Sequence, residues 1–101
     1  MKLTSSLREK KRYVKFSVDG NFSNSQVKTA IESSFKDLHG RLGLAEAGLQ
    51  FVNLNKSNGV VRVNNKTVDK LKSAFTFIDK INEKPARISS LKTSGILERV
   101  I

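Results

Sequence analysis

The sequence of 101 residues contains no cysteine, no tryptophan, one proline and one histidine. Without cysteine the chain forms neither disulfides nor thiolate metal sites, which fits the cytosol, and we expect a cytoplasmic protein. No apolar run approaches the roughly 18 residues that span a bilayer, and the first charges are not followed by a signal-peptide core, so we expect no membrane contact. The length predicts one domain over residues 1–101.

Acidic residues are also scarce, since nine Asp and Glu stand against 19 Lys and Arg, for a net charge of +10. The excess is concentrated in residues 1–15 and 60–101, whereas residues 16–59 are balanced. If the two ends of the chain meet in the fold, this distribution is typical of a surface that binds a polyanion. The alternative is a solvated surface that serves only solubility.

Groups that could perform acid–base or metal chemistry are few. His39 stands alone beside Gly40, at a predicted helix end, where a histidine generally contacts the last helical carbonyls. No spaced cluster of ligands predicts a metal site, and the glycines match no nucleotide-binding loop. An acyl-phosphate hydrolase would need a cation between the first strand and the first helix, and residues 19–25 contain none. We therefore expect no catalytic residues, no metal-binding residues and no cofactor bound by the protein itself.

The first half of the chain predicts a strand followed by a helix. Residues 12–18 alternate, with Val14, Phe16 and Val18 on one face and Tyr13 on the other, as in a strand with one buried face. Ser23 and Gln26 form a capping-box pattern at the start of a helix. The helix carries an apolar stripe of Val27, Ala30, Ile31, Phe35 and Leu38, and Gly40 is its predicted end.

The second half predicts a hairpin, a helix and a strand. Residues 39–48 have three glycines and are expected to be a loop with at most one helical turn. The apolar runs 49–54 and 60–63 flank an Asn-Gly pair, a strong hairpin signal. A helix is expected over 67–83, ended by Pro85, with Ile81 in its buried stripe. A last strand over 86–92 precedes a Ser94-Gly95 turn and an apolar tail.

The predicted order is βαββαβ, which is the ferredoxin-like pattern of the α+β class. In this fold an antiparallel sheet carries both helices on one face, and we expect its other face to be open.

Basic residues cluster around the one tyrosine. Arg8, Lys10, Lys11 and Arg12 lead directly into Tyr13, where cations can neutralise phosphates and a ring can stack on a base. Residues 1–10 are expected to form a flexible basic arm. On the second helix four lysines share one side, which could equally be a solvated helix face: Lys66, Lys70, Lys80 and Lys84. The predicted strand 59–63 has no aromatic residue, so we expect contact with structured RNA through phosphates and shape.

Four segments, in order, resemble the ribonuclease P protein component 2 family of archaea and eukaryotes. They are Leu7–Tyr13, Gly59–Arg62, Val68–Phe75 and Thr93–Ile96, and together they span residues 7–97. Two positions depart from the family pattern. Ile96 stands where the family commonly has threonine, which removes a hydroxyl at that turn, and Val63 replaces a cysteine or similar residue, a difference that we expect to concern packing.

The resemblance implies a ferredoxin-like protein that helps a catalytic RNA to fold. In this family the RNA, with bound magnesium, cuts the 5′ leader from precursor tRNA, so the protein meets precursor tRNA only indirectly. The protein works with a second, barrel-like subunit, ribonuclease P protein component 3. The expected protein is therefore a non-catalytic subunit of a ribonucleoprotein endoribonuclease for tRNA processing, and a homodimer is possible.

Two sets of residues are expected to make contacts in such an assembly. The expected RNA-binding residues are Arg8, Lys10, Lys11, Arg12, Tyr13, Arg62, Lys66 and Lys70. The expected protein-partner residues are Leu42, Leu44, Ile96 and Leu97. Three alternatives stay open from the residues alone: a ribosomal or other structural RNA-binding protein of this fold, a small-molecule regulatory module, and an enzyme.

Overall fold

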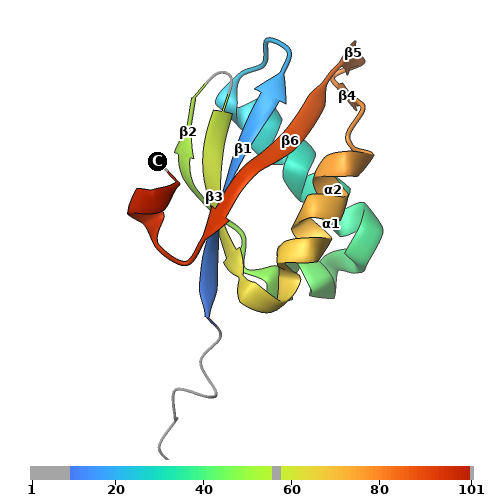
Figure 1. Cartoon of the computed structure of the whole chain (residues 1–101). Coiled ribbons are helices and arrows are strands. Elements are labelled where there is room, and N and C mark those ends of the chain that lie inside the picture. The colour runs from blue at the N-terminus through green and yellow to red at the C-terminus, as the bar shows by residue number, and fades with distance from the viewer. Residues whose placement is uncertain (1–9, 56–57, 101) are drawn as a thin grey trace, which may run out of the picture.

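A computed structural model describes residues 10–55 and 58–100 (Figure 1). Its four-stranded antiparallel sheet has the order β2-β3-β1-β6, and α1 and α2 pack on one face. The predicted ferredoxin-like α+β fold is confirmed. In chain order the elements are β1 (Lys11–Asp19), α1 (Asn24–Ala47), β2 (Gln50–Leu54), β3 (Asn58–Asn64), η2 (Asn65–Thr67), α2 (Val68–Phe77), β4 (Lys80–Ile81), β5 (Lys84–Pro85), β6 (Arg87–Ser94) and η3 (Leu97–Arg99).

The main core lies between the sheet and the two helices. The predicted alternation in β1 is confirmed, because Val14, Phe16 and Val18 are buried on the helix side. The rings of Phe16 and Phe75 lie 5.4 Å apart between centroids, tilted by 48°. Val63 is fully buried in this core.

Helix α1 begins as predicted but continues further. The backbone N–H of Gln26 donates to Ser23 Oγ at 3.2 Å, and the N–H of Ser23 donates to Gln26 Oε1 at 2.9 Å, so the capping box is complete. The loop expected over 39–48 is wrong. Gly40 breaks the helix with φ 76° and ψ 173°, and helical structure then resumes to Ala47 because residues 41–47 are rich in leucine and alanine. Gly48, in the left-handed conformation, ends it.

Helix α2 is shorter than predicted. It ends at Phe77, and residues 80–85 form the small hairpin β4–β5, so the helix expected as far as residue 83 is wrong. Asn82 and Glu83 both have positive φ, as the tight turn of a two-residue hairpin requires. Ile81 is buried as expected, but from a strand, which explains why its spacing imitated a helical stripe.

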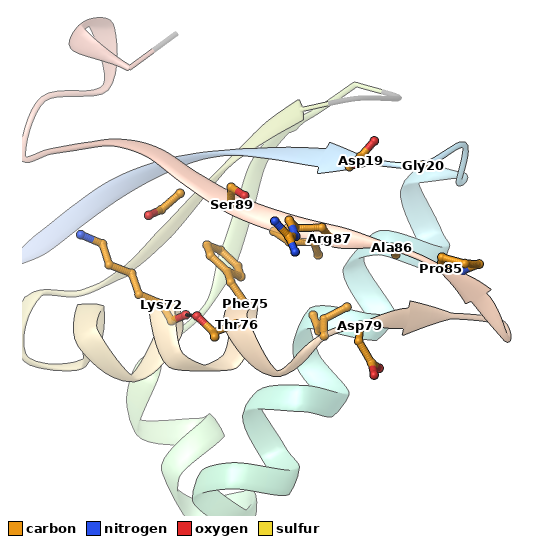
Figure 2. Close-up of a pocket in the computed structure, with 13 residues that line it drawn as sticks. Asp19, Gly20, Lys72, Phe75, Thr76, Asp79, Pro85, Ala86, Arg87 and Ser89 are labelled. Atoms are coloured by element: carbon orange, nitrogen blue, oxygen red, sulfur yellow. Dashed lines mark hydrogen bonds between the residues drawn. The ribbon is translucent and has the colours of Figure 1, made fainter.

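The face of the sheet away from the helices is only partly open. Val60 alternates with the core residues of β3 and therefore points to this face, yet it is 2% exposed. Val100 is also buried, and neither belongs to the main core. The segment containing η3 lies on this side of the sheet, opposite the helices (Figures 1 and 2). The expectation of an open face is thus wrong for the part near β3, where the C-terminal segment supplies a cover.

Candidate nucleic-acid interface

The start of β1 and the end of β3 bring lysines together from two distant parts of the chain. The backbone N–H of Asn65 donates to the carbonyl of Lys10 at 2.7 Å, so Lys10 and the η2 turn that carries Lys66 are adjacent. Lys70 follows Lys66 by four residues on the way into α2, and all three lysines are exposed. We call Lys10, Lys66 and Lys70 the basic end of the sheet. Arg8, also expected to bind RNA, lies outside the described residues.

Lys11 has a structural partner. Its Nζ donates to Oδ1 of Asn64, which is 5% exposed, and Nδ2 of Asn64 donates to the carbonyl of Glu46 in the last turn of α1. A cation near a helix C-terminus also offsets the negative end of the helix dipole. Lys11 therefore joins β1, β3 and the end of α1. Sequence reasoning missed Asn64, since an asparagine after an apolar strand does not reveal a partner 18 residues earlier or 53 residues earlier.

Arg12 lies against the bend that follows β6. Its Nη1 donates to the carbonyl of Lys11 at 3.2 Å. The same nitrogen lies so close to Gly95 that a side chain at that position would have its Cβ only 3.0 Å away. Arg12 is half-buried.

Tyr13 and Arg62 are cross-strand neighbours on the face away from the helices. The register places Tyr13 opposite Arg62 on β3 and opposite Ser94 on β6. Nη1 of Arg62 donates to Gln50 Oε1 at 3.3 Å, while its Nε is buried without a hydrogen-bond partner. Both side chains are half-buried. The structure thus brings together a ring and a guanidinium that are 49 positions apart in the sequence.

The second helix does not carry the four expected lysines. Lys80 and Lys84 lie in the β4–β5 hairpin, at the opposite end of the molecule from the start of β1 (Figure 1). The expected stripe of four lysines is therefore wrong, because α2 ends at Phe77, before Lys80 and Lys84. Lys66 and Lys70 remain near Lys10.

The expected partner residues differ in exposure. Leu42, just after the break at Gly40, is 73% exposed, and Ile96 is 47% exposed. Leu44 is partly buried and packs on the core, and Leu97 is half-buried. Leu42 and Ile96 are thus the two with most surface to offer.

A groove of about 930 Å³ lies between α2 and β6 (Figure 2). Its lining mixes Lys72 and Arg87 with Asp19 and Asp79. Because these charges balance, a polyanion gains less attraction here than at the basic end.

His39 is not placed as expected. Its ring lies 4.8 Å from that of Phe35, and its Nε2 is buried without a hydrogen-bond partner, so it packs on a ring instead of contacting helical carbonyls. The described residues gather no group of three or more His, Cys, Asp or Glu that could hold a metal ion. None of the described helices is long and apolar enough to cross a membrane.

Comparison with known proteins identifies the family. The Rpp14/Pop5 family model matches residues 6–100. Ribonuclease P protein component 2 of Thermococcus gammatolerans is 35% identical and covers 97% of this chain and 85% of its own length. The protein of that name from Methanocaldococcus jannaschii is 29% identical, over 96% of this chain and 74% of its own length.

The fold also matches a solved assembly. A chain in the cryo-EM structure of yeast ribonuclease MRP superposes with a TM-score of 0.73 over 87% of this chain and 76% of that chain, at 16% identity. At that identity the match supports the fold alone. The family model and the two relatives lead to one conclusion: the chain belongs to the Rpp14/Pop5 family and is a homologue of ribonuclease P protein component 2.

Proposed function

We propose that the chain is a non-catalytic protein subunit of ribonuclease P, which binds and stabilises the catalytic RNA that removes the 5′ leader from precursor tRNA. The observation that supports this function is the basic end of the sheet in a homologue of ribonuclease P protein component 2: Lys10 adjoins the turn that carries Lys66, Lys70 follows four residues later, and all three are exposed.

The basic end suits the RNA backbone rather than a small ligand. Residues 10–18 and 58–68 contain no acidic residue, so the cations there have no carboxylate within their own segments. Each lysine that neutralises a phosphate releases counterions, which favours binding without reading the base sequence. A catalytic RNA needs such neutralisation to bring its own phosphates together, and in this proposal the magnesium of the reaction is bound by the RNA.

We also propose that Tyr13 and Arg62 contact RNA beside the basic end. Both are half-buried on the sheet face, so a base could stack on the part of the ring that is exposed. Arg62 keeps one bond to Gln50, which fixes its orientation before any ligand arrives.

A protein partner would dock elsewhere. Leu42 and Ile96 are exposed and apolar, and we propose that one or both contact the barrel-like ribonuclease P protein component 3. Self-association through the same residues would give a homodimer in its absence.

The test is a reconstituted cleavage reaction. Precursor tRNA is incubated at low magnesium with ribonuclease P RNA and component 3, with or without this chain, and release of the 5′ leader is measured. We expect cleavage to depend on the chain. Unchanged cleavage, together with tight RNA binding, would instead favour a general structural RNA-binding protein, such as a ribosomal protein.

A further inference from the structure

Two lysines face each other across the sheet. The register of β1 and β6 places Lys15 directly opposite Lys92, and the β6 strand bulges immediately beside this pair, where Leu91 has no partner on β1. Side chains of directly opposed residues share one face, with Cβ atoms about 4.5–5.5 Å apart, and like charges there are destabilising. Lys15 alternates with the buried residues of β1, so the pair lies on the face away from the helices.

The surrounding positions do not compensate the two charges. In the register of β1, β3 and β6, the nearest pairs on this face are Tyr13 with Ser94 and Ser17 with Ser89, while Val60 lies beside Lys15. None of these is acidic. Further along the same two strands Asp19 faces Arg87, an opposed pair of unlike charges. The sheet therefore has complementary charges at that end and an uncompensated lysine pair in its middle.

The pair is accessible from solvent. Lys92 is exposed and Lys15 is half-buried, and their neighbour Leu91 is 56% exposed. Val60 on β3 is buried, whereas Lys92 and Leu91 on β6 are exposed. An anion could thus approach the β1–β6 half of this face.

We propose that Lys15 and Lys92 together bind a phosphate of the RNA backbone, and that RNA continues from the basic end onto this half of the sheet face. The inference rests on the proposed function and adds a site to it. Tyr13 lies two residues before Lys15 on the same face, about 7 Å along the strand. Its ring is therefore placed between the lysine pair and the start of β1, where a nucleotide spanning the two phosphate sites would pass.

The lysine pair should have opposite effects on the stability of the free protein and on RNA binding. A repulsive pair with no acidic neighbour in the register of β1, β3 and β6 lowers the stability of the free protein, whereas a bound phosphate turns the same two charges into an attraction. Removing one charge should accordingly leave the free protein as stable or more stable while weakening RNA binding. If the pair serves only solubility, removing one charge would not weaken RNA binding.

The test uses the full chain and a transcript of the ribonuclease P RNA catalytic domain. The dissociation constant is measured over a range of salt for the unmodified chain, for Lys15→Gln/Lys92→Gln, and for the control Lys80→Gln/Lys84→Gln, which removes the same charge from the β4–β5 hairpin. We expect the slope of log affinity against log salt to fall in magnitude by about 0.7–0.9 for the shared phosphate in the first variant and to stay unchanged in the control. Lys15→Arg/Lys92→Arg should retain the slope, and thermal unfolding should show Lys92→Gln at least as stable as the unmodified chain.

The outcomes separate this inference from the proposed function. Equal slopes for the Lys15→Gln/Lys92→Gln variant and the control, with the chain still needed for cleavage, would overturn the lysine site alone. A chain that binds the transcript without any salt dependence would overturn both. If the Lys15→Gln/Lys92→Gln variant loses both its salt slope and, by circular dichroism, its folded state, the Lys15→Arg/Lys92→Arg variant decides. A retained salt slope in the arginine variant supports the site, and a lost slope overturns it.

Discussion

Lys11 donates a hydrogen bond to Asn64, its direct neighbour across the β1–β3 ladder, and the two close the end of α1 onto the sheet. Asn64 is the one buried polar side chain among the described residues, and its amide reaches the carbonyl of Glu46. A residue that appears in the sequence as part of an RNA-binding cluster is thus also part of the scaffold. Substituting Lys11 will therefore alter stability as well as binding.

Replacing Asn64 should destabilise the fold. In Asn64→Ala the carbonyl of Glu46 and the ammonium of Lys11 lose their partner, and a buried polar group left unsatisfied costs about 1–3 kcal/mol. The free energy of unfolding is measured by urea titration. Asn65→Ala is the matched control, because Asn65 is exposed and its hydrogen bonds to Lys10 and Val68 are made by its backbone, and it should change stability by less than about 0.5 kcal/mol. Equal losses in the two variants would contradict this account of Asn64.

Two phenylalanines two residues apart on α2 should behave differently. Phe75 is 2% exposed and packs on Phe16, whereas Phe77 is 68% exposed. Phe75→Ala should cost about 3–5 kcal/mol through lost burial and the cavity left behind, and Phe77→Ala about 0.5 kcal/mol or less. Chemical denaturation of both variants measures the difference. A comparable loss in Phe77→Ala would show that this ring is covered in solution.

The capping box should contribute measurably to α1. Ser23→Ala removes the acceptor for the N–H of Gln26, and the loss of an N-cap costs about 0.5–2 kcal/mol. Ser25→Ala, two residues later and exposed within the first turn, is the control and should be neutral or slightly stabilising, since alanine is the better helix former. Thermal unfolding followed by circular dichroism compares them; a control as destabilised as Ser23→Ala would rule out a capping effect.

Neutralising the basic end should weaken RNA binding without unfolding the protein. The triple variant of Lys10, Lys66 and Lys70 to glutamine should reduce the salt slope by about 0.7–0.9 for each phosphate that the protein no longer neutralises. Circular dichroism should be unchanged, because all three side chains are exposed. The control carries glutamine at three exposed lysines elsewhere: Lys36, Lys80 and Lys84. If both triple variants show the same reduction in slope, the basic end has no special role and only net charge matters.

The parts of the fold predicted correctly are those whose signals are local. The alternation of β1 and the capping box at Ser23 need only neighbouring residues, and both are confirmed. The errors occur where local and tertiary signals conflict. The spacing of Ile78 and Ile81 fits a helix, but positive φ at Asn82 and Glu83 turns the chain into a hairpin that buries Ile81 equally well.

In the candidate site, too, the residue types could be predicted from local sequence, whereas their proximity could not. Sequence reasoning could select Lys10 and Lys66 as basic, but their proximity follows from the backbone bond between Lys10 and Asn65, which depends on the register of distant strands. The opposition of Lys15 and Lys92 depends further on the bulge in β6, which shifts that register by one residue. No spacing along the chain encodes either relationship.

The break at Gly40 also bears on how this fold tolerates changes in length. Inside residues 27–35 one inserted residue would rotate every later side chain by about 100° and turn Phe35 away from the core. At Gly40 the backbone leaves helical geometry, so the side-chain directions before this residue do not determine those after it. A residue added or removed there would leave Phe35 in place but would displace the second half of the helix, where Ala47 is buried in the core and the Glu46 carbonyl accepts from Asn64. The glycine thus separates two parts of the helix: a change in length at Gly40 would leave the first part in register with the sheet and would disturb the contacts of the second part with Asn64 and the core.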